Sequence, residues 1–496
     1  MLLKTTQSLC PECLQTLPAE VIEEDDVVYI EKTCPIHGKY RDIYWSDYDL
    51  YEWAKEWDFI GDGLENPRTQ KVKGCPNDCG ICPNHKSHTV LAIIDVTNRC
   101  NLNCPICFAY AGAVGYVYEP SKEQVQAMLR NLRENKPVPG VALQFSGGEP
   151  TLREDLPELV KMATDVGIDH VEVNSNGIVL SRNLDYFKKL IDAGMSTIYL
   201  QFDGLTDDVY LRTRGVPLAE VKMKVVENAR KLGFDSVMLV VTLVRGINDH
   251  ELGDIIRFAA VNSDVVRGIN VQPVSICGRI PREEREKMRI TIPDFMKLVE
   301  KQTDGAVKTS DFRPVTWPLA ISKAVGAIKG RRYVEFTANP LCGVATFIIP
   351  EDGGRKIVPI TKYADVDGFV KALWKAYDDA VAGKKVKARM RLIGSARYVK
   401  GRLFRSLIAR TLTTGAYEAL GEVMRKMVLL GCMHFMDAYN FDLDRVNRCC
   451  IHYLVPDGRL IPFCTMNTLH RPTIEKKLSV PLEEYMQKKA GSLVHH

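Results

Sequence analysis

Three cysteines fall within eight residues directly after an apolar run, in the stretch IIDVTNRCNLNCPICFA at residues 93–109. The run is short and rich in β-branched residues, which predicts a buried strand. Cys100, Cys104 and Cys107 therefore stand at a strand end, where parallel α/β folds carry their chemistry. Three thiolates can hold three corners of a four-iron, four-sulfur cluster and leave the fourth iron free for a small molecule. Structural zinc fits this loop less well, because it takes four closed ligands.

Six short β-branched runs alternate with helix-like stretches in this part of the chain, which predicts right-handed βαβ units and a parallel sheet. Ser121 is a suitable N-cap for one such helix, over residues 121–135. Six repeats are fewer than the eight of a closed barrel, so we expect an α/β fold built on a partial (β/α)6 barrel. The predicted strands are 90–96, 141–146, 170–175, 197–202, 237–244 and 268–274.

At 496 residues the chain is too long for one ordinary core, and we predict three domains. Residues 1–89 are poor in helix signals and rich in Cys, Pro and aromatic residues, as expected of a metal-knuckle module. Residues 90–305 form the predicted barrel. Residues 306–496 contain two similar segments, 342–360 and 450–464, and each is predicted to be a hairpin with a Gly-containing turn.

The overall composition constrains the partners, the compartment and the role of the cysteines. A balance of 66 basic and 62 acidic residues leaves a net charge of only +4, so nucleic acid is not an expected partner. No apolar run is long enough for a signal peptide or a membrane span, which predicts a cytoplasmic protein. In a reducing compartment, fifteen cysteines are expected to be metal ligands rather than disulfide partners.

The motifs at successive strand ends resemble those of the radical S-adenosylmethionine (SAM) superfamily. CNLNCPIC matches its Cys-x3-Cys-x2-Cys pattern, and SGGEP at 146–150 resembles its Gly-Gly-Glu motif. NSNG (174–177), QFDG (201–204) and VQPVSICGR (271–279) follow at further strand ends. The resemblance implies that Cys100, Cys104 and Cys107 hold the SAM-binding cluster, and that a deoxyadenosyl radical removes a hydrogen atom from the substrate.

The same resemblance implies a set of SAM contacts. Bare glycines would let the backbone approach the ligand closely, and Glu149 would accept hydrogen bonds from its ammonium group. Taken singly, Asn176, Gln201 and Asp203 are explained equally well as turn or capping residues. The implied SAM contacts are Phe108, Gly147, Gly148, Glu149, Ser175, Asn176, Gln201, Asp203 and Gln272.

Twelve cysteines remain, which is enough for three further sites of four thiolates. CPEC at 10–13 with CPIHG at 34–38 resembles the paired knuckles of rubredoxin or a zinc ribbon, so we expect a mononuclear iron, or zinc, held with either His37 or, as we prefer, a distant cysteine. The other cysteines predict two auxiliary [4Fe-4S] clusters, making three in all. One would be held by Cys75, Cys79 and Cys82 with a fourth thiolate from elsewhere, such as Cys277, and the other by a C-terminal group of Cys432, Cys449, Cys450 and Cys464. Cys277, Cys342 and Cys432 also fit plain core positions. The remaining candidate ligands are Cys10, Cys13, Cys34, Cys75, Cys79, Cys82, Cys277, Cys342, Cys432, Cys449, Cys450 and Cys464.

The whole arrangement resembles the archaeal tetraether lipid synthases within that superfamily. The resemblance implies carbon–carbon coupling of the phytanyl chains of archaeal diether phospholipids, driven by a low-potential electron donor such as ferredoxin. A basic amphipathic segment at 384–410 would then meet phosphate headgroups, placing the protein at the inner membrane face. Two alternatives are a radical SAM methyltransferase acting on a methanopterin-type pterin, and an iron–sulfur electron carrier without enzymatic activity.

Overall fold

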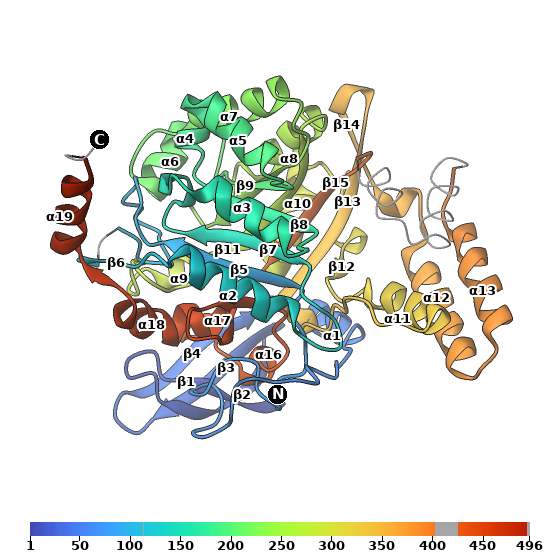
Figure 1. Cartoon of the computed structure of the whole chain (residues 1–496). Helices are drawn as coiled ribbons and strands as arrows, with labels where there is room; N and C mark the ends of the chain where they lie inside the picture. Colours follow the sequence, from blue (N-terminus) through green and yellow to red (C-terminus); the bar gives the residue numbers. More distant parts are fainter. Residues whose placement is uncertain (113, 402–424, 494–496) are drawn as a thin grey trace.

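The computed structural model describes residues 1–112, 114–401 and 425–493 (Figure 1). Its first element is a four-stranded antiparallel sheet in the order β1-β2-β3-β4, drawn in blue below the rest of the molecule in Figure 1. Alternating buried residues along β2 and β3 face one side of this sheet, as expected where one face is covered. The elements are β1 (Leu2–Leu9), β2 (Thr16–Glu24), β3 (Val27–Cys34), β4 (Gly38–Trp45) and α1 (Tyr48–Lys55).

The six predicted strands are confirmed, and they lie side by side in chain order in the central sheet. All five pairings between them are parallel. The first, second and sixth of them are nearly continuous buried runs, which is the pattern of parallel strands covered by helices, whereas the third alternates between buried and partly exposed residues. The protein is therefore an α/β protein. The strands are β5 (Leu91–Thr97), β7 (Ala142–Gly147), β8 (His170–Ser175), β9 (Thr197–Gln201), β10 (Val237–Leu243) and β11 (Val266–Pro273).

Helices connect these strands, and the helix predicted from Ser121 is confirmed. Ser121 caps it by accepting from the backbone N–H of Gln124, whose side chain accepts in turn from the Ser121 N–H. The helices of this part are α2 (Lys122–Arg133), α3 (Leu156–Asp165), α4 (Ile178–Arg182), α5 (Leu184–Asp192), α6 (Asp207–Arg214), α7 (Ala219–Lys231), α8 (Leu252–Val261), α9 (Arg285–Met288) and α10 (Ile292–Gln302).

The C-terminal part of the chain extends the same sheet at both edges. β15 pairs in parallel with β11, and β16 pairs in parallel with β5, so the six-stranded core lies between two later strands. Both predicted hairpins form, as β13–β14 and β16–β17. The strands are β12 (Arg313–Pro314), β13 (Gly343–Glu351), β14 (Lys356–Pro359), β15 (Val428–Met433), β16 (Ile451–Leu454) and β17 (Leu460–Pro462); a separate small pair joins β6 (Tyr116–Val117) to β18 (Val480–Pro481).

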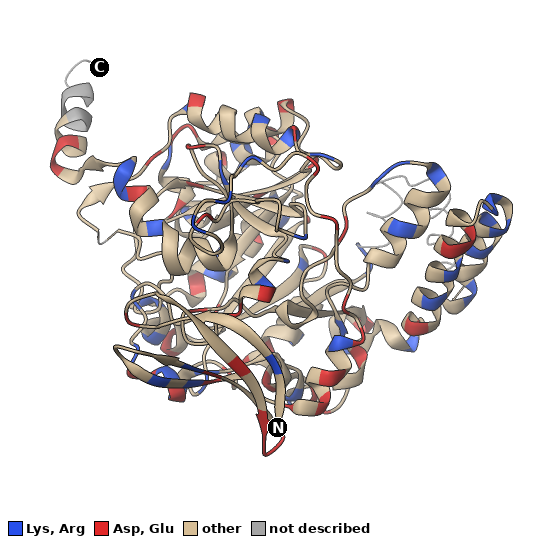
Figure 2. Cartoon of the chain, turned by 90° about the horizontal axis from the view of Figure 1, so that it is seen from below, with Lys and Arg blue, Asp and Glu red and all other residues tan. Residues whose placement is uncertain are grey.

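Helices α11, α12 and α13 pack together as an arm beside the sheet (Figure 1). The charged residues of α13 are all basic, whereas α12 carries both signs, and Asp379 of α12 pairs with both Lys387 and Arg391 of α13 (Figure 2). The rest of the predicted basic segment, from 402, lies outside the described residues. The remaining helices are α11 (Leu319–Lys329), α12 (Val366–Val381), α13 (Lys385–Gly394), α16 (Leu443–Val446), α17 (Phe463–Thr465), α18 (Arg471–Lys477) and α19 (Leu482–Leu493).

A buried ionic network joins the N-terminal sheet to the central sheet. The Arg289 guanidinium donates to Asp437 at 2.8 Å and to Asp42 of β4 at 2.6 Å, and all three side chains are buried. Lys32 of β3 donates to the carbonyls of Ala438 and Tyr439 beside them. These bonds satisfy charges that would otherwise destabilise the interface. Among the described residues, no helix is both long and apolar enough to cross a bilayer.

Candidate active site and metal centres

The loop after β5 places Cys100, Cys104 and Cys107 on one wall of a cavity at the carboxyl ends of the parallel strands. Burial raises the pKa of the Cys100 thiol to about 12, so without a bound metal this thiol resists ionisation. Bound iron removes that penalty, because a coordinating thiol is deprotonated outright. Polar donors already surround the sulfurs: the Leu102 N–H lies 3.4 Å from the Cys100 sulfur, and Arg214 approaches Cys104. The three thiols therefore fit a cluster bound at this wall.

The two glycines of the predicted Gly-Gly-Glu motif let strands approach each other. A Cβ on Gly147, where φ is +127°, would lie 2.1 Å from the Thr97 carbonyl oxygen. One on Gly148 would lie 2.2 Å from the Arg99 carbonyl oxygen. The backbone N–H groups of Gly148 and Glu149 instead donate to those two carbonyls, each at 2.8 Å. Bare glycine at both positions thus fixes the cysteine loop against the end of β7.

Glu149 is buried and joins the ends of β7 and β8. Its Oε2 accepts from the Asn176 N–H at 2.7 Å, and its Oε1 accepts from the Ser175 hydroxyl at 2.8 Å. Thr151 donates to Oε1 as well, through its N–H and its hydroxyl. Burial raises the pKa of Glu149, opposed by these hydrogen bonds. Ser175 and Asn176 also line the cavity, and the Asn176 amide donates to Asn101 in the cysteine loop.

Asp203 is fully buried and bound by an arginine. Both of its carboxylate oxygens accept from Arg214, and Gln201 donates to it at 2.7 Å. The cavity wall is formed by Gln201 and Arg214, whereas Asp203 lies behind them. Lys222 lies beneath this layer and donates to the Asn176 carbonyl and to the Gln201 side chain, so α7 supports the ends of β8 and β9. Of the predicted polar contacts here, Gln201 and Asn176 face the cavity directly.

Phe108 and Gln272 also line the cavity. Phe108 belongs to an aromatic group in which Phe435 and Phe463 stack at 3.9 Å between ring centroids. Phe435 and Phe463 come from segments after β15 and β17, so the C-terminal part of the chain supplies an apolar wall of the cavity.

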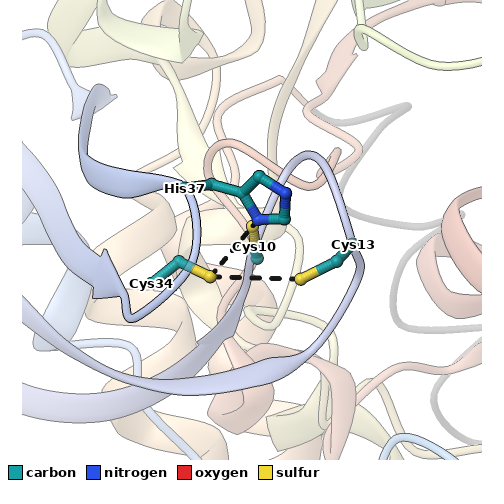
Figure 3. Close-up of side chains that lie close together, drawn as sticks. All are labelled: Cys10, Cys13, Cys34 and His37. Carbon is teal, nitrogen blue, oxygen red and sulfur yellow. Dashed lines mark hydrogen bonds between the residues drawn. The ribbon is translucent and has the colours of Figure 1, made fainter.

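The knuckles at 10–13 and 34–37 converge on one compact site (Figure 3). The ligand atoms of Cys10, Cys13, Cys34 and His37 all lie within 4.8 Å of one another, and His37 Nδ1 is 3.5 Å from the sulfurs of Cys10 and Cys34. The preference for a distant cysteine as fourth ligand is therefore wrong. The turn after Cys34 brings the ring of His37, three residues later, to the site, so a ligand from a distant segment is not needed. Three cysteines and one histidine form a closed tetrahedral set suited to zinc.

The remaining cysteines group differently from their order in the sequence. Burial first, then the charges of Cys450 and Cys342, raises the pKa of Cys449 to about 12, and Cys464 is influenced by Cys449 and Cys342. These four thiols are therefore neighbours. Cys432, which the sequence assigned to the C-terminal group, lies on β15 in the main core, and burial alone raises its pKa.

The triplet at 75–82 lies against the same C-terminal segment. The thiols of Cys75 and Cys79 interact, and Cys79 lies 3.0 Å from the Thr465 hydroxyl. Cys449 also influences Cys79. Cys277, in contrast, faces the cavity that holds the 100–107 loop, and its sulfur lies 3.5 Å from the Ser275 hydroxyl.

Several cavity residues were absent from the sequence-based set. Gln144, Asn174 and Tyr199 lie on the inner faces of β7, β8 and β9. Asn174 and Tyr199 come two residues before the predicted contacts Asn176 and Gln201, and Gln144 comes two residues before the start of the SGGEP motif. Because side chains alternate along a strand, a period of two counted back from the motifs would have found them. Arg214 has no comparable signal, since it reaches the cavity from the end of α6.

Comparison with known proteins agrees with this geometry. The radical SAM superfamily profile matches residues 94–259, and the HMPTM N-terminal zinc ribbon domain matches residues 2–46. The fold and the cavity thus define a radical SAM enzyme with a zinc ribbon ahead of its core. The chain is 51% identical over 494 residues, 97% of both proteins, to the 7,8-dihydro-6-hydroxymethylpterin dimethyltransferase of Methanocaldococcus jannaschii, and it belongs to that protein's family.

More distant similarities are confined to part of the chain. A probable GTP 3′,8-cyclase of Methanothermobacter marburgensis is 31% identical over 196 residues, covering 39% of this chain and 61% of that protein. Among solved structures, HydG, a maturase of the [FeFe]-hydrogenase, matches with a TM-score of 0.39 at 15% identity, covering 67% of this chain and 82% of HydG.

The assignment to the tetraether lipid synthases is wrong, and so is the diether phospholipid as substrate. The relative that matches from end to end is a pterin dimethyltransferase, which corresponds to the first alternative from the sequence. The reason is that the motifs at the strand ends are those of the radical SAM superfamily as a whole, whose members carry out many different reactions. Neither these motifs nor the number of extra cysteines specifies a substrate.

Proposed function

We propose that the protein is a radical SAM methyltransferase whose substrate is 7,8-dihydro-6-hydroxymethylpterin or a close relative of it. The observation that carries the proposal is the 51% identity that runs through the zinc ribbon, the core and the C-terminal segment alike. The cavity supports it, because its polar strand ends and its aromatic wall suit a flat heterocycle with hydrogen-bonding edges.

In this proposal the core is a partial (β/α)6 barrel, and Cys100, Cys104 and Cys107 hold the cluster at its mouth. When bound, the cluster and SAM supply an electron and a reactive carbon centre. The chain positions them: Glu149 fixes the strand end that meets the SAM ammonium, and Arg214 keeps Asp203 and Gln201 in place beside it. Phe108 and the aromatic wall exclude water from the reacting centre.

The other metal ligands are assigned from their positions. The zinc ribbon uses three of the fifteen cysteines with His37, the SAM cluster uses three, and Cys432 is a core residue. Eight cysteines remain, of which Cys277 faces the cavity, and the other seven form two groups that support two auxiliary [4Fe-4S] clusters. One set contains Cys75, Cys79 and Cys82, and the other is drawn from Cys342 and the cysteines at 449–464. A low-potential donor of the ferredoxin kind would reduce these centres.

The test is an anaerobic reaction of reconstituted protein with reductant, SAM and 7,8-dihydro-6-hydroxymethylpterin, followed by mass spectrometry. We expect the pterin to gain one or two methyl groups while SAM is consumed. A variant with Cys100, Cys104 and Cys107 replaced by Ala is the control and should leave both compounds unchanged. If the wild-type protein consumes SAM but returns the pterin unmodified at every substrate concentration, the proposed substrate is wrong.

A further inference from the structure

The interior of the central sheet is polar where such sheets are normally filled by branched apolar side chains. Gln144, Asn174 and Tyr199 face inward from three neighbouring strands, one layer below the strand-end motifs, and all three line the cavity. The register places Asn174 beside Tyr199 and Gln144 beside Glu172, so Glu172 shares the same face, one layer deeper than Asn174.

These side chains have hydrogen-bonding groups that the protein leaves available. The Tyr199 oxygen accepts from the amides of Asn270 and Gln272, which occupies its acceptor positions and leaves its own O–H to donate. No other described residue hydrogen-bonds to the Gln144 amide, although Gln144 is only 5% exposed. Because Gln144 lines the cavity, its amide is free to hydrogen-bond a ligand that enters there.

Glu172 lies directly beneath the residues that line the cavity, beside Gln144, and adds a negative acceptor there. Its Oε1 lies 3.1 Å from His170 Nε2, while its Oε2 is buried and has no partner within the described part of the chain. The Asn174 amide donates to Ser146 at 3.2 Å, which leaves its oxygen as an acceptor. The floor of the cavity therefore offers one phenol donor, one uncommitted amide and one amide oxygen, and the residue beneath it offers one carboxylate oxygen. A carboxylate and an amide side by side match a planar edge that presents adjacent N–H donors.

We propose that Glu172, Gln144 and Tyr199 are specificity-determining residues that bind the aminopyrimidinone edge of the substrate. This inference rests on the proposed function, since a pterin carries a 2-amino group and an N3–H side by side, next to a carbonyl oxygen. Glu172 accepts from the N–H donors, Gln144 pairs with the same edge, and Tyr199 donates to a ring acceptor. Asn270 and Gln272 are positioning residues, because they orient the Tyr199 hydroxyl. The 6-hydroxymethyl end then points up toward the cysteine loop.

The experiment measures binding of 7,8-dihydro-6-hydroxymethylpterin to the reconstituted, SAM-bound enzyme by anaerobic equilibrium dialysis. The variants are Gln144→Leu, Glu172→Gln and Tyr199→Phe, with Gln7→Leu on exposed β1 as the matched control. Each floor variant should weaken pterin binding about 5- to 100-fold, while Gln7→Leu should not change it. The cluster EPR spectrum and SAM affinity should stay at wild-type values in all four, which separates recognition from misfolding.

A second experiment identifies which edge of the pterin the floor residues bind. The wild type should prefer the pterin over its 2-desamino analogue by about tenfold or more, and Glu172→Gln should remove most of that preference. If the wild type binds and methylates the pterin while the three variants bind it equally well, the inference fails and the proposed function stands. If the wild type does not bind the pterin at all, both fail.

Discussion

Replacing Arg289 by Met tests whether the ionic network described above anchors the zinc ribbon to the central sheet. Arg289 is 1% exposed and donates to Asp437 and Asp42, which belong to different parts of the chain. Burial disfavours its charge, but the two carboxylates outweigh this and raise the pKa of Arg289. Met fills a similar volume without a charge, so two buried carboxylates lose their cation. Breaking a buried pair in this way costs about 3–5 kcal/mol of stability.

The matched control is Arg282→Met. Arg282 lies in the same loop region, is 53% exposed and pairs with Glu12 at 3.3 Å. An exposed pair contributes about 0–1 kcal/mol, so this variant should be close to wild type. Urea unfolding of the zinc-loaded full chain, followed by fluorescence and by zinc release, measures both variants. We expect Arg289→Met to release zinc at lower urea concentration, because the ribbon loses its anchor.

A double-mutant cycle tests whether charge pairing is the cause of this loss of stability. Asp437→Asn combined with Arg289→Met should restore part of the lost stability, since one of the uncompensated charges is then removed. If Arg289→Met unfolds at the same urea concentration as Arg282→Met, or if the double variant is simply the sum of the two singles, the network does not stabilise the interface by charge pairing.

Three further predictions follow from the metal sites and the buried carboxylates. His37→Ala should lower bound zinc to well below one ion per chain in metal analysis, whereas His37→Cys should retain it as a four-cysteine site; equal zinc in His37→Ala and wild type would contradict the assigned ligand. Cys432→Ala should keep the full iron content, while Cys342→Ala should lose about four irons per chain; loss of iron in Cys432→Ala would overturn this assignment. Asp442 is buried with Lys4, Tyr44 and Thr6 donating to it, and these bonds outweigh burial and lower its pKa. Its contribution is therefore complete above the unfolded pKa of about 4 and is lost as pH falls through the lower folded value, so Asp442→Asn should flatten the pH dependence of the urea midpoint below about pH 4; an unchanged slope would refute the pairing.

The sequence predicted those features that depend on local pattern. The six strands and the helix capped by Ser121 follow from β-branched runs and from an N-cap with a capping box, and both were found. The zinc ligands at 10–13 and 34 follow from knuckle spacing. These signals are local, because each one is contained within a few residues of the feature that it specifies.

Features that depend on how distant segments meet were missed. Cys432 and Cys342 both lie near a strand end, and their spacing does not reveal that Cys432 faces the core while Cys342 faces the other cysteines. Asp203 was expected to contact SAM, but both of its carboxylate oxygens accept hydrogen bonds from Arg214, eleven residues later in the chain. The glycines at 147 and 148 line the cavity as expected of possible ligand contacts, but their close packing against the backbone at residues 97–99 was not predicted, because it depends on a segment distant from their own motif.

The cavity also shows why the substrate was misassigned. Its floor, with Gln144, Asn174 and Tyr199, comes from the strands of the superfamily core, whereas its apolar wall comes from β15, β16 and the residues after β17. The C-terminal segment therefore shapes the substrate side of a site whose cofactor side the motifs describe. A lipid chain and a flat heterocycle both fit an apolar wall, so cysteine-rich C-terminal segments alone cannot separate these substrates. The polar floor does separate them, because unpaired amide and carboxylate groups favour a ligand with hydrogen-bonding edges and disfavour a hydrocarbon chain.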